Sequence, residues 1–140
     1  MTNIITETHG TLPDGARRVR EIVFVKEQGF EEEFDTIDGY AYHALMTEGD
    51  EPIGTGRVFI DGGAWHIGRL AVRKEYRGIG RGAKILTFLE EIAHREGGNE
   101  VILGAQCRAK DFYLKQGYTP YDDIFDEEGC PHIMMKKQLA

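Results

Sequence analysis

Hydrophobic residues in the first part of the chain follow a strand pattern and then a helix pattern. Residues 3–7 predict a short strand, after which the sequence LPDG supplies turn residues. Apolar residues then recur at helical spacing, which predicts an amphipathic helix from residue 14 or 15 to about Gln28, where Gly29 stops it. Ala16, Val19, Ile22 and Val23 are the apolar positions, and Lys26 continues the same helical spacing.

The pattern changes to that of strands at residue 42. Residues 42–48, 53–60 and 64–72 each have strand character. They are separated by a Gly-Asp-Glu-Pro turn and an Asp-Gly-Gly turn, which are typical of hairpins. The sequence therefore predicts an antiparallel meander of three strands.

A helical period returns after a glycine-rich loop. The apolar face of this predicted helix consists of Ile85, Leu86, Leu89, Ile92 and Ala93. Its opposite, polar face is expected to carry Glu90, Glu91 and Arg95, and the helix ends at Gly97 and Gly98.

The last third predicts one more helix among strands. A strand is expected over residues 100–106, a helix over 108–116 with Gly117 as its stop, and strands over 118–123 and 132–139. Hairpins and crossovers are mixed in this order of elements. We therefore expect an α+β fold with a mixed, mostly antiparallel central sheet flanked by helices, in one domain spanning residues 1–140.

Size and composition restrict the classes of protein that fit. A chain of 140 residues suits one domain with a full core, and a net charge of −7 argues against general binding of nucleic acid. The apolar runs are too short to cross a membrane and residues 1–10 lack the regions of a secretory signal, so a cytoplasmic location is expected. Cys107 and Cys130 form no CxxC pair and no zinc spacing with His132, so we expect reduced thiols and no metal.

Carboxylates are concentrated in one short segment that contains no Lys or Arg: Glu31, Glu32, Glu33, Asp35 and Asp38. Such a cluster can attract a cationic substrate. More often it is a solvated loop, which is the interpretation we favour.

The stretch RGIGRG, residues 77–82, joins an apolar strand to a helix. A junction of this kind leaves backbone N–H groups unpaired at a helix N-terminus, where the helix dipole also favours an anion. Glycines at positions 78, 80 and 82 permit close approach, and Arg77 and Arg81 are expected to add charge-assisted contacts. The loop therefore predicts a phosphate or pyrophosphate site.

Two familiar phosphate motifs fit this loop less well. GIGRGA satisfies the loose dinucleotide fingerprint, but that motif follows the first strand of a parallel sheet, whereas three or four strands precede it here. Only 140 − 82 = 58 residues follow Gly82, too few for the rest of such a domain. GRGAKI also lacks the Gly-Lys-Ser/Thr of a Walker A loop. A pyridine-nucleotide-binding domain is therefore a weak alternative.

The pattern R-x-x-G-x-G fits better, with Arg77, Gly80 and Gly82 preceded by IGRLAV and followed some two dozen residues later by AQCRAKDFYLKQGY. With this pair of signatures, the chain resembles the GNAT family of N-acetyltransferases over essentially its full length. The segment VFVKEQGFEEEFD and the ending CPHIMMKKQL are similar to the small bacterial ElaA/YjcF-like branch. The resemblance implies the GNAT fold and acetyl-CoA as acetyl donor.

The resemblance also implies where acetyl-CoA binds. In GNAT proteins the strand before the glycine loop splays from the next strand, and the pantetheine arm lies in the opening. Backbone groups of Leu70, Ala71 and Val72 would pair with the pantetheine amides, with an N–H near Val72 facing the thioester oxygen. The pyrophosphate would lie on the backbone of Arg77, Gly78, Ile79, Gly80, Arg81 and Gly82.

The second family signature stands here as Gln106, Ala109, Phe112, Tyr113, Gly117 and Tyr118. The resemblance implies cofactor contacts for Gln106, Ala109 and Phe112, with Gln where the family usually has Asn. Tyr113 matches the residue that protonates the departing coenzyme A sulfur in many members, and a tyrosine is a neutral donor at pH 7. The alternative for Tyr113 is a core aromatic without a catalytic role.

The resemblance does not fix the base that removes a proton from the attacking amine. His66 falls on the strand where some protein-modifying members carry a catalytic glutamate, and imidazole suits proton transfer near neutral pH. A histidine on the sheet face without a role is the alternative. Glu27 and Glu33 are the other candidates, acting directly or through water.

These observations predict an N-acetyltransferase that passes the acetyl group of acetyl-CoA to a primary amine by direct attack on the thioester. An acyl-CoA-binding or sensing module without efficient catalysis is the alternative, because the base is undefined. The acceptor is a small-molecule or peptide amine of open identity, and His43 and Arg57 either line its groove or form surface pairs. The resemblance is compatible with a homodimer, since edge-strand dimers are common in the family.

Overall fold

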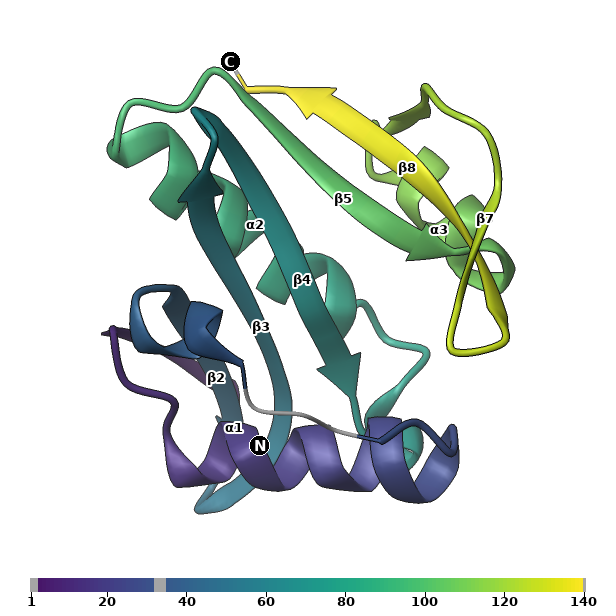
Figure 1. The fold of residues 1–140 in the computed structure, drawn as a ribbon. Helices are drawn as coiled ribbons and strands as arrows, with labels where there is room; N and C mark the ends of the chain where they lie inside the picture. Colours follow the sequence, from purple (N-terminus) through teal and green to yellow (C-terminus); the bar gives the residue numbers. More distant parts are fainter. Residues whose placement is uncertain (1–2, 32–34, 140) are drawn as a thin grey trace.

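The computed structural model describes residues 3–31 and 35–139, which form a twisted sheet with helices on both faces (Figure 1). Within these residues the sheet has eight strands in the order β1-β2-β3-β4-β5-β8-β6, and β7 pairs with β8. All neighbours are antiparallel except β4 and β5, which are parallel. The expected α+β fold with a mixed, mostly antiparallel sheet is confirmed.

The strands of the N-terminal half agree with their predicted positions. They are β1 (Asn3–His9), β2 (Tyr42–Glu48), β3 (Glu51–Asp61) and β4 (Ala64–Val72). The predicted meander is confirmed, because β2, β3 and β4 pair consecutively.

The strands of the C-terminal half agree only in part. They are β5 (Glu100–Gln106), β6 (Thr119–Pro120), β7 (Phe125–Glu127) and β8 (Cys130–Gln138). The strand expected over residues 118–123 is present but shorter, because only Thr119 and Pro120 form it, and β7 forms an unpredicted hairpin with β8. Its turn residues, Glu128 and Gly129, have φ angles of 51° and 76°, the geometry of two-residue hairpins. Glu-Gly is a weaker signal for that turn than Asn-Gly or Asp-Gly.

The helices include one change of winding that the sequence did not predict. Helix α1 (Asp14–Arg20) continues as η1 (Glu21–Glu27), which is wound as a π-helix with Gln28 N–H donating to the Val23 carbonyl at 3.0 Å. The others are α2 (Arg81–Arg95), α3 (Lys110–Lys115) and the short 3₁₀ turns η2 (Thr36–Gly39), η3 (Lys74–Tyr76) and η4 (Cys107–Ala109). Among the described residues, no helix has both the length and the apolar character needed to span a membrane.

Helices α1 and α2 cover opposite faces of the sheet (Figure 1). Ile85 and Leu89 of α2 belong to the main core, and they lie directly on β3 because Gly54 and Gly56 have no side chains. A Cβ atom at Gly54 would be 2.6 Å from Ile85 Cδ1, and one at Gly56 would be 2.7 Å from Leu89 Cδ1. On the other face, Val19 and Val23 of the α1–η1 helix pack with Ala71 of β4.

Strands β4 and β5 are neighbours for only a short distance. Their pairing consists of Trp65 with Val101 and His66 with Ile102. Beyond these positions each strand keeps its other neighbour, β3 or β8, and Figure 1 shows β4 and β5 diverging toward their C-terminal ends. The splay expected before the glycine loop is present.

A bulge lies in the diverging part of β4. Arg69 and Leu70 together oppose the single residue Gly56 of β3, and Arg69 adopts a φ of 50°. A bulge of this kind bends its strand and increases the local twist. Strand β4 therefore follows β3 away from β5.

A buried ionic cluster fastens the segment before β2 to the sheet. The Asp38 carboxylate accepts hydrogen bonds from Arg20 at 2.9 and 3.2 Å and from Arg57 at 2.8 Å, and Arg57 also donates to Asp35 at 2.8 and 3.1 Å. Arg20, Asp38, Arg57 and His43 are all less than 9% exposed. The solvated-loop prediction is therefore wrong for Asp35 and Asp38, and surface pairing is wrong for Arg57 and His43. Buried guanidinium groups require carboxylate partners, and these partners come from separate elements.

Glu90 also departs from its predicted place on the polar face of α2. It is buried, and it accepts hydrogen bonds from the Tyr118 hydroxyl at 2.7 Å and from Lys137 Nζ at 3.0 Å. Burial and the bonded carboxylate raise the pKa of Tyr118 above its ordinary range. The contact joins α2 to β8, and the satisfied oxygens make burial of the carboxylate tolerable.

Asp38→Ala should destabilise the protein strongly, because it leaves Arg20 and Arg57 buried without their shared carboxylate. We expect urea denaturation at pH 7 to show a loss of about 3–5 kcal/mol in the free energy of unfolding. Asp61→Ala, at an exposed hairpin position, is the control and should change that free energy by less than about 0.5 kcal/mol.

The same variant should lose part of the acid sensitivity of the fold. Burial raises the pKa of Asp38, but the hydrogen bonds and charges of Arg20 and Arg57 outweigh it and hold the pKa below its ordinary value of 3.8. The contribution of Asp38 is therefore complete above about pH 4 and is lost as the pH falls through the lower folded-state pKa. Stability of Asp38→Ala should decline less steeply on acidification. If the free energies of unfolding of the native protein and the variant fall in parallel as the pH is lowered, the Asp38 carboxylate is not a source of the acid sensitivity.

Candidate active site

A cavity of about 310 Å³ opens where β4 and β5 part. Leu70 of β4 and Gln106 of β5 line it from the two diverging strands, and Ala109 and Tyr113 line it from the η4–α3 segment. The structure thus brings residues of the second family signature and of the strand before the glycine loop to one opening.

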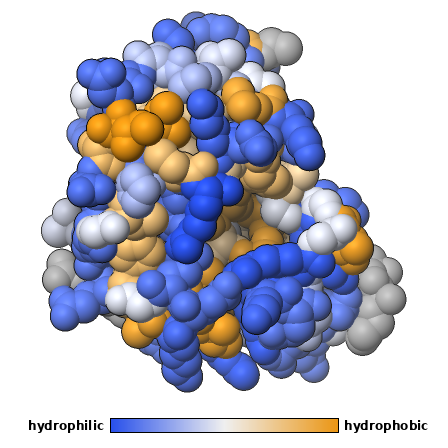
Figure 2. All heavy atoms as spheres, turned by 90° about the vertical axis from the view of Figure 1, so that its right-hand side faces the viewer, coloured by the Kyte–Doolittle hydropathy of each residue, from blue (hydrophilic) through white to orange (hydrophobic). Residues whose placement is uncertain are grey.

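The remaining walls come from segments that are distant in sequence. Phe24 and Phe30 lie at the end of the first helix, and Glu127, Glu128 and His132 belong to the β7–β8 hairpin. In Figure 1 the tip of this hairpin lies above the C-terminal end of that helix. Figure 2 shows this side of the molecule hollowed between an upper and a lower part, with hydrophobic residues deep in the hollow and hydrophilic residues around it.

The glycine loop has the backbone geometry of an anion site. Gly80 precedes α2 with a φ of 84°, and Gly78 has a φ of 93°, both in the region that favours glycine. The first helical hydrogen bond runs from Lys84 N–H to the Gly80 carbonyl at 3.1 Å. The N–H groups of residues 81–83 precede it and have no helical carbonyl to bond. Open space surrounds Gly78 and Gly80, so a ligand can approach the main chain.

The two loop arginines bind protein groups. Arg77 donates from Nε to the Val72 carbonyl and from both terminal nitrogens to Glu27, each at 2.7 Å. Arg81 donates to Glu48 at 2.9 Å. The expectation that these side chains contribute directly to anion binding therefore gains no support, because their guanidinium groups are engaged in ion pairs. The main chain is the part of the loop that stays accessible.

Gln106 links the opening to the first helix. Its Nε2 donates to Gln28 Oε1 at 2.9 Å, and its Oε1 accepts from Arg108 Nε at 2.6 Å. Both ends of the amide are thus engaged, and the longer side chain that replaces the usual Asn reaches across to Gln28.

The other cofactor candidates outside the glycine backbone do not line this cavity. Phe112 packs beside the start of α2, since a Cβ atom at Gly82 would be 3.5 Å from its ring. Ala71 and Val72 are buried in the two cores, whereas Ile79 stands 66% exposed at the loop tip.

Tyr113 lines the cavity from α3 and packs against other aromatic rings. Its ring lies edge-on to Phe112 and Tyr118, with centroid distances of 5.0 and 5.7 Å. Burial raises the pKa of Tyr113 to about 12, because the phenolate would lose its solvation there. The phenol is therefore protonated at any physiological pH.

Two of the three residues that the sequence predicted as bases, His66 and Glu27, do not line the cavity. His66 stacks on Phe59, with ring centroids 5.2 Å apart, at the last position of β4 that pairs with β5, and it lies outside the cavity wall. Glu27 is held by Arg77, whose hydrogen bonds keep the pKa of Glu27 below its ordinary value and weaken it as a base. Glu33 lies outside the described residues.

The hairpin residues Glu127, Glu128 and His132 were missed as site residues. They reach the cavity only because β7 folds back on β8, and that hairpin was not predicted. The sequence pointed to His132 only as a possible zinc ligand, and the spacing of the cysteines excluded that role.

Comparison with known proteins agrees with the geometry. Residues 13–139 match the family model of the acetyltransferase (GNAT) domain. The chain belongs to the GNAT acetyltransferase family. YjcF of Bacillus subtilis, described as an uncharacterized N-acetyltransferase, is 37% identical over 98% of this chain and 99% of its own. ElaA of Escherichia coli is 30% identical over 87% of this chain and 84% of its own, so the predicted likeness to this branch is confirmed.

Solved GNAT structures share the architecture. The crystal structure of Escherichia coli ElaA has a TM-score of 0.85 at 28% identity, covering 97% of this chain and 99% of that one. An aminoglycoside 6'-N-acetyltransferase complexed with coenzyme A has a TM-score of 0.74 at 17% identity, with 96% of each chain covered. This second likeness concerns the fold alone. GNAT proteins use acyl-CoA donors and acetylate amine acceptors.

Tyr113 should remain un-ionised where an ordinary tyrosine is already a phenolate. At about pH 10.5 an exposed tyrosine is more than half ionised, whereas Tyr113, with a pKa of about 12, is almost fully protonated. The phenolate absorbance of the native protein and of Tyr113→Phe should therefore coincide at that pH. In denaturant the two should differ by one tyrosine, and a one-tyrosine difference in the folded proteins would contradict the burial of this side chain.

Proposed function

We propose that this protein is an N-acetyltransferase that transfers the acetyl group of acetyl-CoA to a primary amine by direct attack on the thioester. The observation that carries the proposal is the cavity between the diverging strands β4 and β5, which has a protonated phenol on its wall. Membership of the GNAT family supports the acyl-CoA donor.

In this proposal the donor binds along the opening. The backbone of residues 70–72 faces the missing neighbour of β4 and pairs with the pantetheine amides, as an added strand would. The N–H groups at the start of α2 hold the pyrophosphate, aided by the helix dipole. Ala109 and Phe112 pack around the arm from the other side.

Tyr113 serves as the proton donor to the departing sulfur. Its raised pKa keeps it protonated but also makes it a weak acid toward an ordinary thiolate, whose pKa is about 8.5. The same burial destabilises the thiolate and raises the pKa of the coenzyme A thiol. The difference between this pKa and that of Tyr113 is therefore smaller in the site. The hydrogen bond from the phenol is therefore strongest when negative charge has developed on sulfur, as catalysis requires.

The acceptor is a small-molecule or peptide amine that enters from the side of the first helix and the β7–β8 hairpin. Release of free thiol from acetyl-CoA across a panel of primary amines tests the reaction directly. If acetyl-CoA binds but no amine causes release of its thiol, the alternative function, an acyl-CoA-binding module, would be favoured.

Gly80→Glu should weaken binding of acetyl-CoA, because it places a carboxylate beside the proposed pyrophosphate position. We expect the dissociation constant measured by titration calorimetry to rise at least about tenfold, the effect of roughly 1.4 kcal/mol of repulsion. Gly63→Glu is a matched control in the β3–β4 turn. Gly63 has a φ of 81°, close to the 84° of Gly80, and both have open space around them. The two variants therefore introduce the same charge and similar backbone strain. Equal affinity in the two variants would exclude the loop as the anchor.

Tyr113→Phe should lower turnover while preserving donor affinity. Loss of a general acid typically costs about 10²- to 10⁴-fold in rate, and the ring that packs against Phe112 and Tyr118 is retained. Steady-state thiol release gives the rate and calorimetry gives the affinity. Undiminished turnover would remove Tyr113 from the mechanism and leave it as a core aromatic.

A further inference from the structure

We propose that His132 is the general base of the reaction, taking the proton from the acceptor amine at its Nε2 atom. This inference rests on the proposed acetyl transfer and assigns a role that neither family signature contains. His132 lies on β8, lines the cavity together with Tyr113, and is only 5% exposed.

The hydrogen bonding of the ring fixes which nitrogen is available. Nδ1 lies 2.8 Å from the Cys130 carbonyl oxygen, and a carbonyl can only accept a hydrogen bond. The proton of the neutral ring is therefore on Nδ1, and the lone pair is on Nε2. Because the partner is a backbone atom of the same strand, this tautomer is built into the fold.

The Glu127 carboxylate lies close enough to form an ion pair with the protonated His132 ring. Its Oε2 lies 3.4 Å from His132 Nε2, across the β7–β8 hairpin. Once Nε2 has taken a proton, the two groups form an ion pair. The Glu127 side chain is 60% exposed, so water screens the attraction between the two groups.

The sheet places His132 and Tyr113 on opposite sides of the opening. His132 pairs directly with Gln106 of β5, so the two side chains project from the same face, and the Gln106 amide bonds Gln28 at the end of the first helix. Tyr113 packs instead against the core beneath α2, where it contacts Tyr118. A thioester between β4 and β5 would thus meet the amine and base from one face and the acid from the other.

The chemical step balances with these two residues. His132 Nε2 accepts a proton from the bound ammonium group, and the free amine attacks the thioester carbonyl carbon. The C–N bond forms and the C–S bond breaks, and sulfur leaves with the electron pair and takes the hydroxyl proton of Tyr113. The second proton lost by nitrogen restores the Tyr113 hydroxyl, and His132 releases its proton to solvent.

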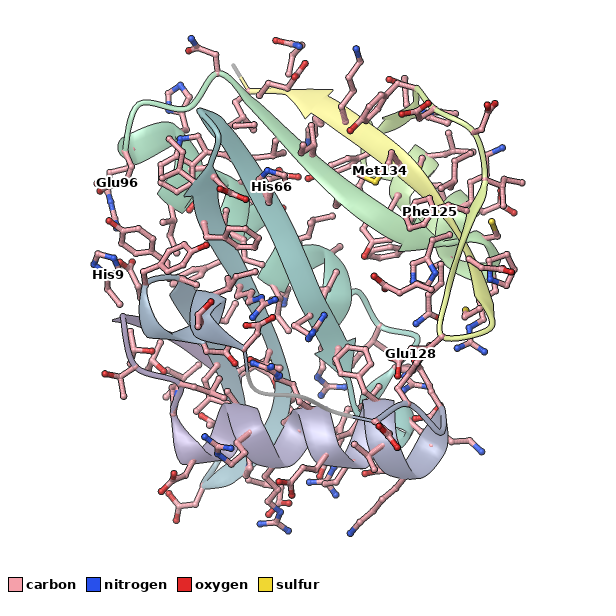
Figure 3. All side chains as sticks on the ribbon, viewed as in Figure 1. His9, His66, Glu96, Phe125, Glu128 and Met134 are labelled. Atoms are coloured by element: carbon pink, nitrogen blue, oxygen red, sulfur yellow. The ribbon has the colours of Figure 1, made fainter. Side chains whose placement is uncertain are left out.

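The other proton acceptors on the cavity wall are less suited to this task. Glu31, Glu127 and Glu128 are exposed carboxylates, and Figure 3 shows Glu128 at the tip of the hairpin. A solvated carboxylate accepts protons far less readily at neutral pH than an imidazole does. His132 alone among the described residues of the wall combines an imidazole with burial.

The test uses His132→Asn, because Asn retains a side-chain N–H that can donate to the Cys130 carbonyl but has no nitrogen that accepts a proton. With the amine that gives the fastest thiol release in the native protein, kcat should fall by about 100-fold or more, and acetyl-CoA affinity should stay unchanged. Glu127→Gln should lower kcat by at most about fivefold, since its pairing is exposed. His94→Asn, at an exposed position of α2, is the control and should retain full turnover.

The basicity of the acceptor amine distinguishes a general base from a structural residue at position 132. With 2,2,2-trifluoroethylamine, which is largely unprotonated at neutral pH, the defect of His132→Asn relative to the native protein should shrink about tenfold or more. An equal defect with basic and weakly basic amines would overturn the inference and indicate a structural role. Loss of turnover in His66→Asn but not in His132→Asn would transfer the role to His66.

A second measurement does not depend on turnover. Histidine-selective ¹⁵N NMR of the native protein, with His132→Asn for assignment, should show the neutral His132 ring protonated at Nδ1. Protonation at Nε2 would overturn the inference. Because acetyl-CoA binding and thiol release in the native protein are measured separately, an active enzyme with an unaffected His132→Asn variant refutes this inference alone. Absence of thiol release from the native protein with every amine refutes both.

Discussion

The short parallel pairing of β4 with β5 is the constraint on which the rest of the molecule depends. After His66 and Ile102 the two strands separate, and each stays paired with its outer neighbour, β3 or β8, with one bulge between β4 and β3. The facing edges therefore present backbone groups that have no partner strand, although the Val72 carbonyl accepts a hydrogen bond from Arg77. Their side chains continue into buried clusters on both faces. The opening thus combines aromatic and polar side chains on its walls with polar main-chain groups along its edges, which suits an extended ligand that carries amides.

Several contacts between distant parts of the sequence hold this opening in place. The Gln28–Gln106 amide pair joins the first helix to β5, and the Arg77–Glu27 ion pair joins the same helix to the glycine loop. Deeper inside, Asp38 bridges Arg20 of α1 and Arg57 of β3. The π-helical segment η1 contributes Glu27 to these contacts, and its Phe24 lines the cavity. The N-terminal helix is therefore part of the site as well as of the core.

The proposed acid, Tyr113, and the proposed base, His132, lie on opposite faces of the sheet. The partly buried Tyr113 phenol lies with the core beneath α2, and a histidine with its tautomer set by the backbone lies on the face of the first helix. Proton acceptance and proton donation are thereby separated by the thickness of the sheet. Such a separation lets one site keep a base and an acid in their working protonation states without neutralising one another. The apolar walls around the acid strengthen its hydrogen bond to developing charge.

The sequence by itself determined the meander, the glycine loop and the two signatures that indicate acetyl-CoA, because these depend on local spacing and turn chemistry. It also located Tyr113. Only the tertiary structure decided that Asp38 and Glu90 are buried, that Arg77 and Arg81 bind carboxylates, and that His132 rather than His66 lies on the cavity. The reason is physical. Each of these outcomes depends on partners 18 or more residues away, or on a hairpin whose turn residues are weak local signals, so no short stretch of sequence specifies them.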